Sequence, residues 1–218
     1  FAGGYAGPNA SEEVVINYYL KDRVTSGDVM VEIFDLQGRK IMQLPGGKRK
    51  GINKVKWNMR MMPPKVATGG DGLDFGGFVA PLLPAGIYTV KVTKGTEYAD
   101  GNIELIKDPD SPHSEEDRKA QYETQMKLYQ MVEDLAFVSD QLQDQQKTSK
   151  DLLAKIKNVK TLTPLINTYG KELEDIRKTL LATKEAKGGI TGEEQIREKL
   201  STIYAAVAGY EGRPSEVY

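Results

Sequence analysis

Hydrophobic and polar residues alternate along the first half of the chain, as expected of β-strands with one buried face. The clearest case follows a Pro-Ala-Gly turn, where Tyr88, Val90 and Val92 fall on one face. Alternating or β-branched runs predict further strands at 14–20, 29–34, 39–44 and 53–58, near 98, and at 103–106. Turn signals separate them at roughly 8–12 residues, the spacing of an antiparallel sandwich. We therefore predict an all-β sandwich of Ig or fibronectin-III type at 13–110, preceded by a glycine-rich lead-in at 1–12.

A long irregular segment at 61–83, rich in glycine and proline, interrupts the strand pattern. A connection of this length inside a compact domain usually carries a function or is disordered. Phe75 and Phe78 are apolar residues within it that need a place to pack. They are our candidate binding residues, and we expect the segment to contact a partner.

The period changes to three or four residues after Pro109 and Pro112. Apolar stripes at 128–142, 152–159, 166–180 and 196–207 predict helices, with a break or loss of cover over the polar run 140–150. Thr163 is a candidate cap with Pro164 in the first position, and residues 191–194 resemble a capping box. We predict a helical hairpin or three-helix bundle over 111–218. Because the stripes are narrow, we expect them to pack on a third helix, on the sandwich or on a partner.

Composition narrows the classes of function. The chain of 218 residues is 39% hydrophobic, enough for two modest cores, and its formal net charge is −1. This balance does not support nucleic-acid binding. Without cysteine the chain has no disulfide or thiolate metal site, and no apolar run approaches the roughly 18 residues of a membrane span. The start at Phe1, without Met or a signal peptide, leads us to expect either a removed leader or a piece of a longer protein.

No residues form a recognisable catalytic constellation. His113 is the only histidine and, beside Pro112, is expected to be a solvated loop residue without a nucleophile motif to pair with. The acids at 108, 110 and 115–117 lack EF-hand spacing, and helix capping accounts for the last three. The segment 69–77 lacks the Gly-Lys-Ser/Thr of a phosphate loop. We therefore expect no catalytic residue, cofactor or metal.

Two surface interpretations compete with simpler ones. The basic turn 48–50 suits an anionic partner, although a solvated hairpin turn explains it more simply. The aromatic residues Tyr18, Tyr19, Trp57 and Tyr88 would suit a carbohydrate-stacking platform, although aromatics at alternating strand positions more often belong to a sandwich core.

Five motifs, taken in order, resemble the C-terminal region of large bacterial sortilin-type proteins with BNR repeats, which are often labelled glycosyl hydrolases. They are Tyr18-Tyr19-Leu20-Lys21, Val31-Glu32-Ile33-Phe34-Asp35-Leu36-Gln37-Gly38-Arg39, Gly51 with Val55-Lys56-Trp57-Asn58-Met59-Arg60, Pro84-Ala85-Gly86-Ile87-Tyr88, and Asp108-Pro109. The resemblance covers about 4–112, and the lead-in resembles a segment that joins a β-propeller to a sandwich. The sandwich also resembles the Ig-like domain of flagellar hook-capping proteins.

The resemblance implies a β-propeller followed by a sandwich and a helical tail. This chain contains no propeller, so the hydrolase residues of that family have no positions here, and analogy of fold supplies no activity. Our leading hypothesis is a non-catalytic accessory module of an exported bacterial protein, periplasmic, cell-surface or extracellular, docking on a β-propeller or another protein partner. The alternatives are a carbohydrate-binding module of a glycan-degrading enzyme, the C-terminal part of a sialidase-like or sortilin-like hydrolase, or an enzyme whose activity the sequence hides.

Overall fold

A computed structural model of the chain describes residues 13–69, 78–156, 159–183 and 194–215. The contacts divide the chain into two units, one of strands and one of helices. The strand unit comprises Phe1–Met62 and Leu82–Pro109, and the helical unit comprises Pro63–Pro81 and Asp110–Tyr218. The two sequence-predicted domains, 13–110 and 111–218, differ from these units in the placement of 63–81.

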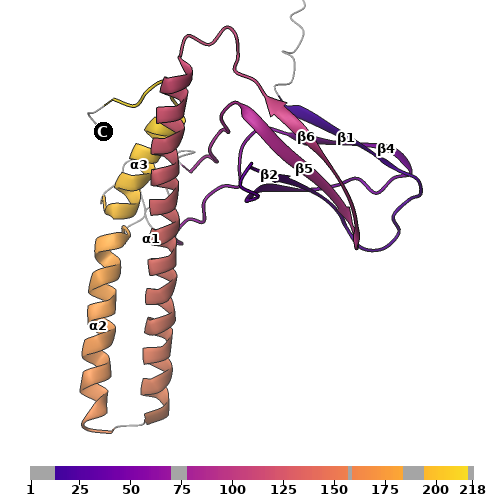
Figure 1. Ribbon diagram of the computed structural model, residues 1–218. Coiled ribbons are helices and arrows are strands. Elements are labelled where there is room, and N and C mark those ends of the chain that lie inside the picture. The colour runs from indigo at the N-terminus through magenta and orange to yellow at the C-terminus, as the bar shows by residue number, and fades with distance from the viewer. Residues whose placement is uncertain (1–12, 70–77, 157–158, 184–193, 216–218) are drawn as a thin grey trace, which may run out of the picture. The chain divides into compact units, whose positions relative to one another are not determined.

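Among the described residues, the strand unit has two antiparallel sheets built from six strands (Figure 1). These are β1 (Val14–Leu20), β2 (Val29–Phe34), β3 (Lys40–Pro45), β4 (Gly51–Trp57), β5 (Gly86–Lys94) and β6 (Glu97–Leu105). One sheet pairs β1 with β4, and the other has the order β3-β2-β5-β6. The prediction of an antiparallel β-rich fold is confirmed, except that β6 is one strand where the sequence indicated two short ones.

Short-range hydrogen bonds and a glycine form the turn after β2. The Asp35 carboxylate accepts hydrogen bonds from the backbone N–H groups of Gln37 and Arg39 at 3.0 and 2.8 Å. Gly38 has a φ of +77°, which a residue with a side chain rarely adopts. The turn is therefore fixed by a short-range pattern that the sequence displays.

The core of the strand unit holds the alternate residues of β2, β4 and β5. Val31 and Ile33 of β2 are completely buried. Trp57 of β4 is 1% exposed and meets the ring of Tyr88 from the other sheet edge-on, with centroids 6.3 Å apart. The indole N–H of Trp57 donates to the carbonyl oxygen of Arg60 at 2.9 Å, so its polar group is satisfied.

The described part of the helical unit contains three helices, which confirms the change of period that the sequence shows. They are α1 (Glu115–Ile156), α2 (Leu162–Leu180) and α3 (Ile196–Ala208). The expected break at 140–150 is wrong, since α1 is continuous through it. Leu142 and Ser149, seven residues apart, are both buried on one face, and the intervening Gln and Lys residues are good helix formers.

The starts of α2 and α3 differ from those expected, whereas the start of α1 does not. The Oγ of Ser114 accepts the backbone N–H of Asp117 at 3.1 Å, as expected of a cap. Helix α2 begins at Leu162 after Thr161, so Thr163 is not its cap. A capping box precedes α3, but Gln195 and Glu198 form it, and residues 191–193 of the expected box lie outside the described part.

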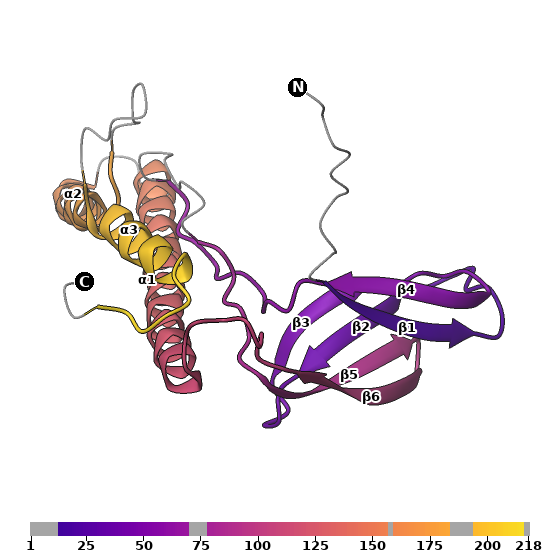
Figure 2. The ribbon, with the colours of Figure 1, turned by 90° about the horizontal axis from the view of Figure 1, so that it is seen from above.

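Both shorter helices pack against α1. Figures 1 and 2 show α2 beside the C-terminal half of α1 and α3 beside its N-terminal half. Gln146 of α1 donates to Glu174 of α2 at 3.0 Å, and Gln121 of α1 donates to the carbonyl of Val207 of α3 at 2.9 Å. The described helices include none that is long and apolar enough to cross a membrane.

The segment 63–81, between β4 and β5 in sequence, packs within the helical unit. Ala67 lies in one buried cluster with Ala136 of α1 and with Leu181. The Tyr204 hydroxyl of α3 donates to the carbonyl oxygen of Val79 at 2.8 Å. The described parts of this segment, 63–69 and 78–81, therefore contribute to the core of the helical unit.

Candidate functional site

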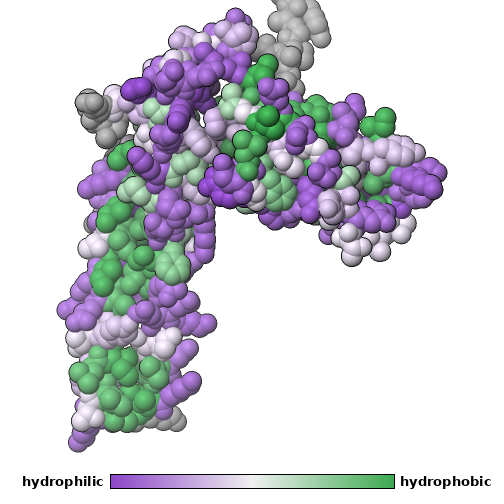
Figure 3. Space-filling model, in the orientation of Figure 1, coloured by the Kyte–Doolittle hydropathy of each residue, from purple (hydrophilic) through white to green (hydrophobic). Residues whose placement is uncertain are grey.

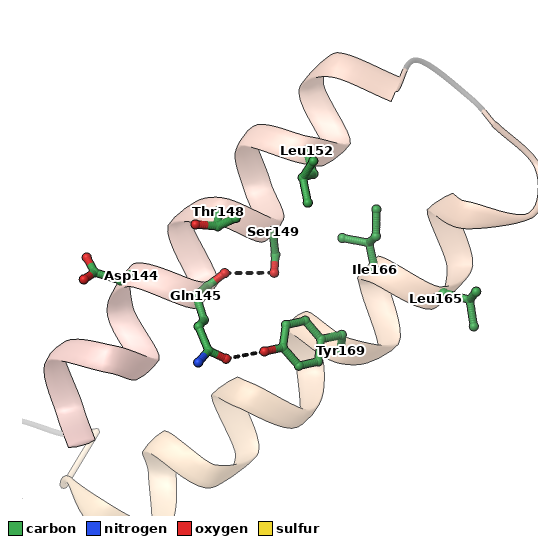
Figure 4. Close-up of a pocket in the computed structure, with 8 residues that line it drawn as sticks. All are labelled: Asp144, Gln145, Thr148, Ser149, Leu152, Leu165, Ile166 and Tyr169. Carbon is green, nitrogen blue, oxygen red and sulfur yellow. Dashed lines mark hydrogen bonds between the residues drawn. The ribbon is translucent and has the colours of Figure 1, made fainter.

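A groove of about 420 Å³ lies between the C-terminal half of α1 and the N-terminal half of α2. Eight residues line it: Asp144, Gln145, Thr148, Ser149, Leu152, Leu165, Ile166 and Tyr169 (Figure 4). A volume of several hundred Å³ is typical of sites that bind ligands or large side chains.

The groove exists because the two helices contribute unequal side chains. On α1, Thr148 and Ser149 are short, and the Ser149 hydroxyl is bound locally, donating to the carbonyl oxygen of Gln145 at 2.9 Å. On α2, Ile166 and Tyr169 are large. Figure 4 shows Leu152 and Ile166 directed into the space between the helices, and they leave a hollow beside the serine. Small residues opposite large ones thus leave an opening in place of a closed seam.

The rim of the groove is apolar and accessible. Leu165 is 66% exposed, and Leu152 and Tyr169 are each 43% exposed. Leu162 and Ile176 continue the row of exposed apolar residues along α2. Leu173 is the one buried residue of this helix. Figure 3 shows hydrophobic side chains gathered at the end of the α1–α2 pair where the helices join. Contiguous exposed apolar residues of this kind typically mark interaction surfaces.

The polar groups of the groove make hydrogen bonds that orient its side chains. The Tyr169 hydroxyl donates to Oε1 of Gln145 across the two helices. Asp144 and Tyr169 are the ionisable members of the lining. The chemistry of this lining is apolar contact with a polar edge, which suits a protein segment or an apolar ligand.

Farther along the same helix pair, Glu174 is held in its charged form. Its carboxylate accepts two hydrogen bonds from Arg177 at 2.8 Å and one from Gln146 at 3.0 Å. The hydrogen bonds from Arg177 have the largest influence on the pKa of Glu174 and lower it. Partial burial raises this pKa, whereas the hydrogen bond from Gln146 lowers it further, and the result is a pKa of about 2 because the hydrogen bonds stabilise the carboxylate more than burial disfavours it. This interhelical contact fixes α2 against α1 beyond the groove.

The candidate binding residues lie elsewhere. Phe75 is outside the described residues. Phe78 is half-buried against α3, with its ring centroid 5.9 Å from that of Tyr204 and 5.6 Å from the guanidinium carbon of Arg197. Phe78 therefore contributes to the packing of the 63–81 segment on α3.

Arg197, which lies over the ring of Phe78, also forms a buried ion pair with Glu198. Arg197 and Glu198 are 4% and 6% exposed, with Nη1 and Oε1 3.6 Å apart. The carboxylate of Glu198 accepts the backbone N–H groups of Ala182 and Gln195, each at 3.2 Å, and Arg197 donates to the carbonyl oxygen of Ala67 at 3.2 Å. These bonds join three separate chain segments, so the pair has a structural role at the start of α3.

The other sequence candidates occupy structural positions. His113 packs edge-on against Tyr210, with centroids 5.3 Å apart. Hydrogen bonds from Ser114 and then Arg213 lower the pKa of Asp117. In the basic turn, Lys48 pairs with Asp28 at 2.7 Å. The described residues contain no group of three or more side chains placed to hold a metal ion.

The aromatic residues considered for carbohydrate stacking do not share one exposed face. Trp57 and Tyr88 are buried, Tyr18 is half-buried, and Tyr19 alone is largely exposed. A stacking platform needs accessible rings, so the burial of Trp57 counts against that alternative.

The groove could not be identified from the sequence, because the residues that line it form no recognisable sequence motif. Its only signal in the sequence is the polar run 140–150 beside an apolar stripe, which suggests lost cover without showing which residues face each other. Comparisons of the chain with protein-family models, with curated proteins and with solved structures give no match.

Proposed function

We propose that this chain is a non-catalytic interaction module that binds an amphipathic helical segment of a protein partner in the groove between α1 and α2. The observation that carries the proposal is the exposure of Leu152, Leu165 and Tyr169 around a hollow in an otherwise packed helix pair. An apolar helix face laid into such a groove is a recurring mode of peptide recognition.

The geometry favours a helix over a small apolar ligand. Two helices bury little apolar surface, and a third helix along their seam would complete a bundle of ordinary layer packing. Burying a leucine side chain contributes about 1.5–3 kcal/mol, and Leu165 begins two-thirds exposed. Several such residues along α2 are needed to offset the cost of association, so an extended occupant suits the row better than a compact one.

The finer description of the fold belongs to this proposal. The contact of Trp57 with Tyr88, one ring from each sheet, supports a face-to-face sandwich of Ig or fibronectin-III type. The hydrogen bond from Gln146 to Glu174 and the interhelical Gln145–Tyr169 contact support an α1–α2 hairpin, to which α3 adds a third helix. Both are common scaffolds for binding surfaces.

The biological setting follows from the resemblance to sortilin-type BNR-repeat proteins. Under this proposal the module belongs to an exported bacterial protein, at the periplasm, cell surface or outside the cell. A β-propeller or another surface protein supplies the partner. The docking surface proposed is the helical groove, because the 63–81 segment packs on α1 and α3.

A titration with a defined probe tests the function. The probe is a fluorescein-labelled synthetic helix with leucines on one face, and its anisotropy is followed as the full chain is added. We expect saturable binding that Leu165→Ser abolishes. The matched control is Ile52→Ser, which removes a similarly exposed apolar residue from β4. Equal binding by both variants, or none by the unmodified chain, would refute the proposed docking site.

A further inference from the structure

We infer that β1 (Val14–Leu20) pairs antiparallel with β1 of a second copy of this chain, so that two small sheets join into one of four strands in the order β4-β1-β1-β4. The inference goes beyond the proposed function, because it concerns the free edge of a strand and not the groove between the helices. Three observations carry it: β1 has an unpaired edge, it lacks charge, and its sequence complements itself.

Strand β1 is hydrogen-bonded along one edge only. Its sheet has two strands, and β1 pairs with β4 over its whole length, from Val14 opposite Trp57 to Leu20 opposite Gly51 (Figure 2). Among the described residues, no strand or loop backbone pairs with the other edge of β1. A row of free N–H and C=O groups is a template for another extended strand. The chemistry of this edge therefore selects an extended polypeptide segment as its occupant.

Charged residues or proline protect the other three strand edges of the two described sheets, but not β1. These residues are Lys54 and Lys56 on β4, Lys40 and Pro45 on β3, and Glu97, Asp100 and Glu104 on β6. The seven residues of β1 include no charged residue, proline or glycine. Because such residues normally prevent edges from pairing, their absence leaves β1 open to pairing.

The sequence of β1 complements itself when two copies run antiparallel. A two-fold axis at Asn17 places the two Asn17 side chains opposite each other, and it pairs Val14 with Leu20, Val15 with Tyr19, and Ile16 with Tyr18. Each β-branched residue thus meets an aromatic residue or a leucine of the other copy, and aromatic with β-branched pairs are favourable across strands. Each asparagine amide offers both a donor and an acceptor at the axis. The second copy of β1 is therefore a well-matched occupant of this edge.

The same register gives neighbours to the apolar residues on the outer face of the small sheet. Val15 is 45% exposed, Tyr19 is 66% exposed and Ile52 is 72% exposed. Tyr19 pairs with Ile52 of its own chain, and in the dimer it also pairs with Val15 of the other copy. One apolar row therefore crosses the joined sheet on each side of the axis. The apolar area that these rows remove from water favours association in addition to the backbone hydrogen bonds.

The lysines of β4 limit the assembly to two copies. Asn17 pairs with Lys54, so the two Lys54 residues of the dimer are three strand spacings apart, about 14 Å, and repel each other little. Lys54 and Lys56 then lie on both outer strands of the joined sheet, where they oppose the addition of further strands. The assembly is closed by its two-fold axis.

Single cysteines report this pairing directly, because the chain contains no cysteine of its own. In Asn17→Cys the two introduced residues face each other with Cα atoms about 4.5–5.5 Å apart, a distance that a disulfide spans. We expect oxidation with copper-phenanthroline to convert the full chain to a covalent dimer on non-reducing gels. The matched control is Ile52→Cys, which is exposed on the same face of the same sheet. Its two copies lie at least about 14 Å apart, so it should stay monomeric on the same gels.

Two further cysteine variants test the direction of pairing. In the antiparallel register Val15→Cys and Tyr19→Cys cross-link with each other when the two proteins are mixed, and neither cross-links alone. Parallel strands would instead cross-link each variant with itself. Self-linking of either variant would therefore overturn the antiparallel register.

The association state provides a test without cross-linking. Sedimentation equilibrium of the unmodified chain should give a mass that rises to about twice 24.1 kDa through the micromolar range. Asn17→Lys places two like charges directly opposite each other and should weaken association at least about tenfold. Ile52→Lys, whose lysines lie far apart, should remain a dimer.

The outcomes separate this interface from the groove. Leu165→Ser, which abolishes probe binding under the proposed function, should leave the dimer intact, and a monomer in that variant would place the contact at the groove and overturn the inference. A mass of 24.1 kDa at all concentrations would also overturn it, and so would cross-linking of Ile52→Cys as fast as Asn17→Cys. None of these results alters the test of the groove, which the anisotropy titration decides by itself.

Discussion

Tyr204 provides the sharpest test of the finding that 63–81 belongs to the helical unit. Its side chain on α3 is completely buried, its hydroxyl donates to Val79 at 2.8 Å, and its ring packs on Phe78. Both contacts are made to the segment that interrupts the strand pattern. Removing them should therefore destabilise the helices, although the segment lies between two strands in the sequence.

The expected magnitudes follow from what each substitution removes. Tyr204→Phe keeps the ring and loses one hydrogen bond, a cost of about 1 kcal/mol. Tyr204→Ala also removes a fully buried ring, which costs about 3–5 kcal/mol in protein cores. For a unit of this size each kcal/mol lowers Tm by about 3 °C, so the two variants should differ by roughly 10 °C.

Two spectroscopic signals separate the units. Trp57 is the only tryptophan of the chain and lies in β4, so its fluorescence follows the strand unit. Circular dichroism at the helical minimum follows α1, α2 and α3. We expect Tyr204→Phe and Tyr204→Ala to shift the helical transition more than the Trp57 transition. Tyr19→Phe, which alters a largely exposed tyrosine of β1, is the control and should shift neither.

The reasoning fails if Tyr204→Phe leaves the helical transition unchanged, because the hydroxyl then contributes nothing to the packing of 63–81. It also fails if Tyr204→Ala lowers the Trp57 transition alone. That result would assign the segment to the strand unit, against the contacts of Ala67 with Ala136 and Leu181.

Three further predictions concern a carboxylate, a glycine and the tryptophan. The pKa of Glu174 is lowered to about 2, chiefly by its hydrogen bonds to Arg177. The stabilisation that the charged carboxylate gives is therefore present above the ordinary carboxyl pKa and is lost as pH falls from about 4.5 to about 2. Glu174→Gln should lessen this loss of stability in acid titrations followed by circular dichroism. A Cβ on Gly46 would lie 2.6 Å from the Tyr18 hydroxyl, so Gly46→Ala should destabilise the strand unit by about 1–3 kcal/mol in urea titrations, whereas Gly101→Ala, with open space around it, should not. Because Trp57 is 1% exposed, soluble polysaccharides should leave its emission maximum unchanged, and a saturable shift would revive the carbohydrate-binding alternative.

Local patterns predicted the elements well where each element carries its own signal. The strand β1 (Val14–Leu20) matches its β-branched run, and Asp35 and Gly38 form the turn that their chemistry requires. The break in α1 at 140–150 was predicted wrongly, because polar residues on an exposed face do not end a helix whose other face is buried at Leu142 and Ser149.

The candidate site was hardly predictable. The sequence suggested Phe78 as a binding residue, but its ring packs against Tyr204 and Arg197 of α3. Leu165 has the character of an ordinary member of an apolar stripe, and the structure leaves it 66% exposed. Neither outcome follows from helix or strand periodicity, since each depends on a residue far away in the chain.

The sequence by itself determined the periods, the turns and the division into strands followed by helices, because alternation and turn geometry act over a few neighbouring residues. Only the tertiary structure decided that 63–81 completes the helical core, that Arg197 and Glu198 are buried together, and that Ser149 lies in the same groove as Ile166. These outcomes arise from surfaces that meet across long separations in the chain. These long-range contacts decide which small side chain lies opposite which large one, and in the α1–α2 pair this pairing produces the groove.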